Sequence, residues 1–168
     1  MDESKRRMVE GWLDKASAHL EMAMQHAKSS YRITESIQAS QLCVELSVKA
    51  VLTILGIDYP ASHGWDQKQL AKIAAQVQDK KLLHRLAEQN LGYIRLPRLL
   101  ILVNFWEQFY IQAKYGIEAS NLAPPQDLFD SEDAELAVRH AEQCISAATD
   151  LRYLSNERLA AILNPPGN

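Results

Sequence analysis

Three side chains near the middle of the chain have types and spacing that suit ligand binding. Glu45 and Lys49 lie four residues apart with the acid first, so on a helix they form an ion pair. The pair has three interpretations: an ordinary surface pair, a partly buried pair among apolar neighbours, or a ligand contact. His63 follows Pro60 in a loop, where an imidazole can hydrogen-bond to backbone or exchange a proton near neutral pH. We take Glu45, Lys49 and His63 as candidate ligand-binding residues.

A second set of candidates lies in the C-terminal half. Lys114 and Tyr115 end the most apolar stretch of the chain, where a lysine either stabilises the C-terminus of a helix or binds a phosphate. Arg139 and His140 stand among many acids, which favours a solvated helix face. We keep Lys114, Tyr115 and Arg139 as ligand-binding candidates beside the first three.

Known catalytic and metal-binding patterns are missing from the sequence. It contains no P-loop, G-x-G-x-x-G, H-E-x-x-H or G-x-S-x-G pattern. A di-iron bundle needs Glu-x-x-His pairs, whereas Glu21–His26 and Glu135–His140 are five residues apart. Cys43 and Cys144 are far apart and lack metal or redox spacing. The sequence therefore predicts no catalytic residue of a known pattern, no metal and no cofactor.

The elements that must position these residues are helices. Apolar residues recur every three or four positions almost throughout, and 6 Gly and 6 Pro in 168 residues disfavour a many-stranded fold. Helix ends are marked by Gly56 after the second helix, by an Asp66–Gln69 capping box, and by Asp79 as the cap of a helix with Leu82, Leu83 and Leu86 inward. We expect helices near 12–27, 33–55, 66–77, 79–91, 97–115, 131–151 and 155–163.

These helices predict an all-α, up-and-down antiparallel bundle of four to five main helices plus short extra ones. At roughly 100–200 residues per domain, we expect a single domain over 1–168, with its core at about 10–153 and a short C-terminal helix at 155–163. Residues 42–52 are apolar on most sides, which indicates a central helix. Residues 99–111 are more apolar than one bundle position needs, which suits either a dimer surface or a buried core helix.

The charge of the chain limits the classes of partner that it is expected to bind. With 18 basic and 21 acidic residues, the net charge of -3 argues against nucleic-acid binding over the whole surface. The basic residues gather at Lys80, Lys81, Arg85, Arg95 and Arg98, while acids gather from 127 to 142, so a local RNA or protein contact stays open. The longest apolar run, 99–103, is far below the roughly 20 residues of a membrane span, and the N-terminus is no signal peptide. We expect a cytoplasmic protein without membrane contact.

Three segments in order resemble the HEPN family of helical-bundle proteins: residues 38–70, the run Tyr110–Gly116, and the run Phe129–Glu135 before an alanine-striped helix. The resemblance covers roughly 12–151, with 71–102 longer than in a minimal member. It implies a prokaryotic bundle that is usually dimeric and often paired with a small nucleotidyltransferase in toxin–antitoxin or defence systems. Many members are metal-independent ribonucleases that use Arg and His with four to six residues between them.

This chain departs from the ribonuclease pattern. No Arg has a His at that spacing, and Lys114-Tyr115-Gly116 stands where the family has an Arg-Tyr-Pro-like run. We therefore expect a non-catalytic HEPN-like homodimer that binds a nucleotide or a partner protein. One alternative is a ribonuclease assembled from distant segments, such as Lys114 or Arg139 with His63 or His140. Another is a plain interaction module in which 80–98 docks an acidic partner.

Overall fold

The computed structural model describes residues 2–117 and 123–164, and this part of the chain is built almost entirely from helices. It holds two 3-10 turns, Gly92–Ile94 and Pro125–Asp127, and an isolated β-bridge between Ile117 and Ala123, but no strand within the described residues. The all-α prediction is therefore confirmed. The α-helices are α1 Glu3–Ala27, α2 Ile33–Ile54, α3 Gln67–Asp79, α4 Leu82–Glu88, α5 Leu96–Tyr115, α6 Ser131–Arg152 and α7 Asn156–Leu163.

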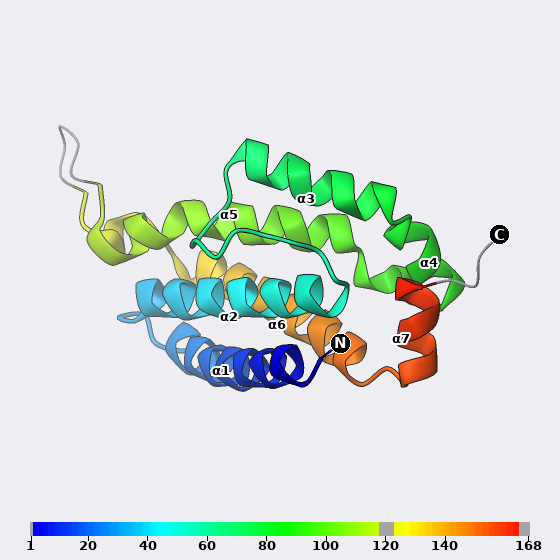
Figure 1. Ribbon diagram of the computed structural model, residues 1–168. Coiled ribbons are helices and arrows are strands. Elements are labelled where there is room, and N and C mark those ends of the chain that lie inside the picture. The colour runs from blue at the N-terminus through cyan, green and yellow to red at the C-terminus, as the bar shows by residue number, and fades with distance from the viewer. Residues whose placement is uncertain (1, 118–122, 165–168) are drawn as a thin grey trace.

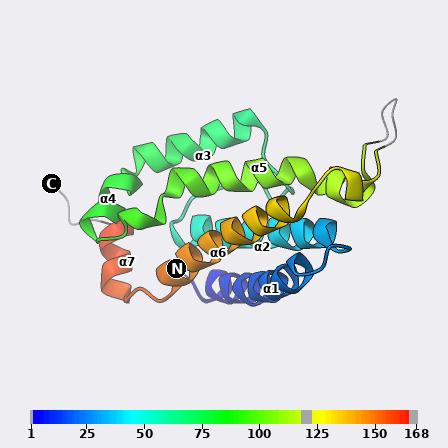
Figure 2. The ribbon, with the colours of Figure 1, turned by 180° about the vertical axis from the view of Figure 1, so that it is seen from behind.

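Four long helices, α1, α2, α5 and α6, form the bundle, and each runs opposite to the one before it (Figures 1 and 2). α2 is central because it contacts α1, α5 and α6. α3 lies along the N-terminal half of α5, while α7 packs against α4 at the end of the bundle. The C-terminal half of α5 extends beyond α3 (Figure 1). α2 is long and apolar enough to span a membrane by composition, but a buried core helix passes the same test, and 78% of that window is buried here.

Small residues let α6 approach α2 closely. Four alanines of α6 are fully buried, and the Cys43 thiol of α2 lies 3.8 Å from the Ala141 carbonyl oxygen. A side chain larger than a methyl group at these positions would push the two helices apart. The buried alanines are Ala134, Ala137, Ala141 and Ala148.

Several expected helix ends are confirmed. Asp66 and Gln69 form the capping box of α3, with the Gln69 amide donating to Asp66 Oδ1 at 2.7 Å. Gly56 follows α2 with φ of +62°, which a glycine adopts at low cost, and the helices expected near 131–151 and 155–163 begin after the caps Asp130 and Ser155. Each of these signals is local, so the sequence alone was sufficient to place them.

Two helices begin at other residues than the sequence predicts. Asp79 does not cap α4: it is the last residue of α3, and Lys81 precedes α4 in the left-handed conformation at φ 51°. Only Lys80 and Lys81 therefore separate α3 from α4. Leu82 and Leu86 are buried as expected, whereas Leu83 is 48% exposed. α1 begins at Glu3 rather than near residue 12, because Asp2 caps a first stretch that carries almost no apolar stripe. Residues 118–122, between the helices expected near 97–115 and 131–151, lie outside the described residues.

Candidate functional site

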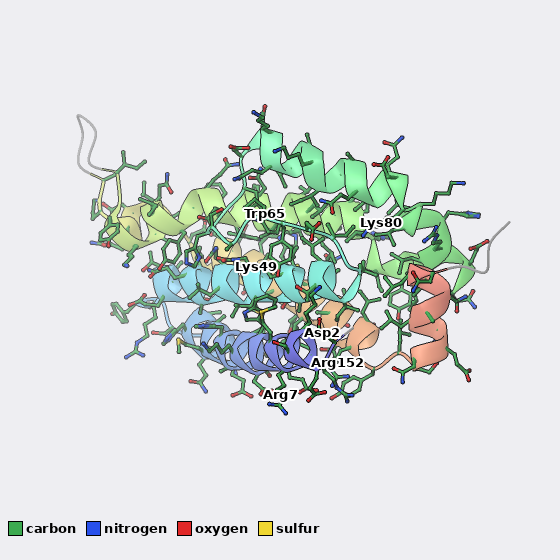
Figure 3. All side chains as sticks on the ribbon, in the orientation of Figure 1. Asp2, Arg7, Lys49, Trp65, Lys80 and Arg152 are labelled. Atoms are coloured by element: carbon green, nitrogen blue, oxygen red, sulfur yellow. The ribbon has the colours of Figure 1, made fainter. Side chains whose placement is uncertain are left out.

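A buried ion pair lies on the face of α2 that looks toward α5. Lys49 Nζ donates to Glu45 Oε1 at 2.7 Å, and the two residues are only 7% and 2% exposed. Their i, i+4 spacing makes the pair, and the apolar neighbours on α2 keep water away from it. Among the three interpretations of this pair, the structure therefore excludes the ordinary surface pair. Lys49 and Trp65 lie on the same side of α2 (Figure 3).

The loop between α2 and α3 closes over this pair. His63 Nδ1 lies 2.9 Å from Oε1 and 3.0 Å from Oε2 of Glu45, while Lys49 Nζ also donates to the Ser62 carbonyl at 3.3 Å. The loop is shaped by its own bonds, since Trp65 Nε1 donates to the Pro60 carbonyl at 3.2 Å. The His63 side chain is 79% exposed, so its ring is open to a ligand.

Two further residues, Gln41 and Glu107, belong to the cluster and were not expected. Gln41 Nε2 donates to Glu45 Oε2 at 3.2 Å and to Glu107 Oε2 at 2.7 Å, so it links the two carboxylates. Gln41 is 2% exposed, and its Oε1 has no hydrogen-bond partner among the described residues. The sequence does carry a signal for both: Gln41 stands four residues before Glu45, and Glu107 is the only charged residue between Leu99 and Ala113.

The two carboxylates have opposite pKa shifts. Burial opposes ionisation of Glu45, but hydrogen bonds from Lys49 and His63 outweigh it and lower its pKa. At Glu107, burial first and the nearby Glu45 charge second raise the pKa of the carboxyl. A cavity of about 280 Å³ opens beside them, lined by Gln41, Leu42, His63, Glu107, Tyr110 and Ile111. We call this cavity the acidic notch.

The chemistry of the notch suits hydrogen-bond donors and cations. It presents the Glu107 carboxyl, which accepts hydrogen bonds, while Gln41 Oε1 is enclosed and has no partner among the described residues. A phosphate group would be repelled by Glu107 and Glu45. No group of three or more His, Cys, Asp or Glu side chains within residues 2–117 and 123–164 is arranged to hold a metal ion.

A glycine lets the loop approach Glu107 this closely. Gly64 has φ of +68°, and a Cβ placed on it would lie 2.5 Å from Glu107 Cγ. Gly64→Ala is therefore expected to lower the free energy of unfolding by about 1–2 kcal/mol, because a left-handed alanine is strained and Glu107 must move. Gly11→Ala on α1 is the matched control, since its Cβ would meet nothing within 4 Å. Urea denaturation measures both, and equal stabilities of the two variants would contradict this account of the loop.

The remaining candidates lie apart from the cluster. Arg139 is exposed on α6 and lies 3.9 Å from Glu135, an ordinary helix pair. Lys114 and Tyr115 are exposed at the end of α5, where Lys114 Nζ lies 5.1 Å from the ring centre of Tyr115 and 5.8 Å from that of Tyr110. The structure thus brings Glu45, Lys49 and His63 together, but neither Arg139 nor Tyr115 joins them.

An Arg–His contact connects α5 and α6 away from the notch. Trp106 Nε1 donates to His140 Nδ1 at 3.1 Å, which leaves the imidazole proton on Nε2, and Arg98 Nη2 lies 3.3 Å from that Nε2. Burial first, then the charges of Arg98 and Arg139, lower the pKa of His140. Two donors therefore face each other, and an anion that accepts a hydrogen bond from each would relieve their repulsion. The arginine in contact with His140 is Arg98, which the sequence marks only as a member of the basic segment at 80–98.

Much of that basic segment makes contacts within the chain. Lys80 Nζ donates to the Gly56 carbonyl, and Arg85 Nη1 donates to the Ile162 carbonyl at 3.1 Å. Arg98 Nε donates to Gln143 Oε1 at 3.0 Å. Three of its five cations thus hold helices together, which weakens the case for 80–98 as a dedicated docking patch.

The family comparison agrees with this architecture. The family model for the HEPN domain matches residues 9–151, which is most of the chain. Comparisons with curated proteins and with solved structures find no match. The matched range begins in α1 and ends in α6, so it contains all of α2 and α5, most of α1 and α6, and the acidic notch. By this match, the chain belongs to the HEPN domain family.

Proposed function

We propose that this HEPN domain is a non-catalytic binding module that self-associates through the outer face of α5. The observation that carries the proposal is an apolar stripe on that face, in which Ile101 is 66% exposed and Ile111 is 56% exposed. Phe105 and Tyr115 are exposed on the same side. Their spacing follows the helical repeat, so they form one surface rather than scattered residues.

The surface around the stripe is hollowed. Two cavities of about 420 and 460 Å³ lie between α3 and α5 and share Ala74, Pro97 and Leu100. An exposed apolar surface that is also concave is typical of protein-binding faces. Covering it contributes about 25 cal/mol for each Å² of apolar area removed from water. A second copy of the chain supplies the same stripe and is the partner that we propose.

Ile111→Asp tests this proposal directly. A carboxylate in the middle of the covered stripe is expected to raise the dimer dissociation constant about tenfold or more, which corresponds to about 1.4 kcal/mol. Light scattering on a size-exclusion column measures the mass of wild type and variant. Tyr31→Asp is the matched control, since Tyr31 is 94% exposed at the end of the bundle and its replacement makes the same charge change. A dimer that survives Ile111→Asp, or that Tyr31→Asp weakens equally, would refute the α5 face.

The rest of the expected function belongs to the same proposal. A small nucleotidyltransferase as second partner, a toxin–antitoxin or defence role, a prokaryotic source and a cytoplasmic location follow from the family resemblance and the sequence. A nucleotide ligand finds less support, because the acidic notch presents Glu107 where a phosphate would lie. Self-association is therefore the part of the proposal that the geometry supports best.

One observation favours a second candidate function. The contact of Arg98 with His140 gives a ribonuclease the two side chains it needs, a guanidinium for the phosphate and an imidazole for the proton. Incubation with labelled RNA distinguishes the candidates. The binding module predicts no cleavage by the wild type, whereas wild-type cleavage that is lost in His140→Ala would establish the ribonuclease.

A further inference from the structure

Two opposite charges on α5 lie on one side of the helix. Glu107 and Lys114 are seven residues apart, which is two helical turns, and Tyr110 and Ile111 lie between them. Glu107 is one of the residues that line the acidic notch. Lys114 is exposed further along and lies over the rings of Tyr110 and Tyr115. A spacing of seven in a helix pair places both side chains on the same flank of the contact.

We infer that Lys114 of a second copy enters the acidic notch and pairs with Glu107, so that the dimer contains two such pairs. This inference rests on the proposed self-association and adds its register and orientation. When two α5 helices pack antiparallel about a two-fold axis between Phe109 and Tyr110, each glutamate lies within about 3 Å, measured along the helix axis, of the level of the partner's lysine. The two contacts are equivalent because a two-fold interface is self-complementary.

The same register places Ile101, Ile111 and Tyr115 of the apolar stripe in the seam between the helices, with Phe105 on its other flank. With Glu107 and Lys114 on the flank, the seam between the helices contains Ile101, Asn104, Gln108, Ile111 and Tyr115. Ile111 then lies opposite the partner's Gln108, and Tyr115 lies opposite the partner's Asn104. Polar residues at a seam cost stability but fix one register, as Asn does in coiled coils. Ile111 and Tyr115 belong to the half of α5 that extends past α3 (Figure 1), whereas Ile101, Asn104 and Gln108 line the cavity that α5 forms with Leu70 and Ala74 of α3.

The notch has one carboxylate that suits an incoming ammonium group. Gln41 Oε1 is enclosed and has no partner in the described part of the chain, so the accessible acceptor is Glu107. The Glu107 carboxyl has one hydrogen bond, from Gln41, and its raised pKa reflects the lack of a nearby cation strong enough to offset burial and Glu45. An ammonium group carries donors and a positive charge, so it can hydrogen-bond to the Glu107 carboxylate and offset its charge. Tyr110, on the rim of the notch, offers an aromatic face to the same cation.

Charge reversal on the full chain tests the inference. Lys114→Glu is expected to raise the dimer dissociation constant about tenfold, since both pairs change from attraction to repulsion. Glu107→Lys should do the same, and the double variant Glu107→Lys/Lys114→Glu should return the constant to within about threefold of wild type. Mixing the two single variants should likewise restore a dimer. Sedimentation velocity measures these constants, and Lys15→Glu on the exposed face of α1 is the control with the same charge change.

The possible outcomes distinguish a failure of the Glu107–Lys114 pairing from a failure of self-association itself. A wild type that stays monomeric overturns both. A dimeric wild type that is insensitive to Lys114→Glu, or a double variant that stays as weak as the single ones, overturns the Glu107–Lys114 pairing and leaves self-association standing. Glu107 also contacts Gln41, so circular dichroism checks the fold of each variant. If Glu107→Lys is unfolded, Glu107→Gln replaces it, and an unchanged dissociation constant there also counts against the pairing.

Discussion

Glu45→Ala is expected to lower the free energy of unfolding by about 3–5 kcal/mol. The substitution leaves the Lys49 ammonium buried at 7% exposure, with the Ser62 carbonyl as its remaining hydrogen-bond partner. Gln41 loses one of its two acceptors, and the imidazole of His63 loses the carboxylate that holds the loop. Removing one partner of a buried pair costs more than the pair itself contributes, because the other charge stays away from water.

A second substitution checks this reason. In Glu45→Met/Lys49→Met, no buried charge is left alone, so most of the lost stability should return. Guanidinium denaturation followed by circular dichroism gives the free energies. Glu21→Ala, at an exposed position of α1, is the control and should stay within about 0.5 kcal/mol of wild type. A loss below about 1 kcal/mol for Glu45→Ala would mean that the pair is hydrated in solution.

The pH dependence of this effect has a definite sign. The pKa of Glu45 in the folded state lies below its ordinary value of 4.5. Its contribution is therefore fully present above the ordinary pKa and is lost as the pH falls through the folded pKa. The difference in stability between wild type and Glu45→Ala should shrink as the solution is acidified below about pH 4.5. Urea denaturation over a pH series measures this difference.

The second large effect is expected where α6 meets α2. Ala141 is fully buried, and its carbonyl oxygen lies 3.8 Å from Cys43 Sγ. Ala141→Leu adds three carbon atoms where α6 packs closely against α2. The overpacking should lower the free energy of unfolding by about 2–3 kcal/mol. The same measurement on Ser146→Leu, which faces solvent on α6, gives the cost of leucine itself. Similar stabilities for the two variants would contradict close packing through the alanines.

The fold could be predicted from the sequence where the signals are local. The capping box of Asp66 and Gln69 and the left-handed Gly56 mark helix ends within a few residues, and both are present. The start of α4 could not be predicted, because Lys81 adopts a left-handed conformation that its residue type does not signal. The early start of α1 was missed for a related reason: its first turns are exposed and charged, so they carry no apolar period.

The candidate site also contains some contacts that the sequence predicts and others that it does not. Glu45 and Lys49 lie on one helix, so their spacing alone predicted the contact. Gln41 could have been found by extending that spacing one turn toward the N-terminus. Glu107 and Arg98 could not be assigned, since their partners Gln41 and His140 lie 66 and 42 residues away and meet them only through the packing of α5. His63 was predicted as a loop residue, but its contact with Glu45 depends on the path of the loop.

Sedimentation equilibrium of the wild-type chain over a wide concentration series measures whether the chain self-associates. A HEPN domain that acts through self-association should show a mass that rises reversibly from 19.0 kDa toward twice that value as concentration increases. A mass that stays at 19.0 kDa at every concentration would contradict the account, because the stripe on α5 would then need a different partner.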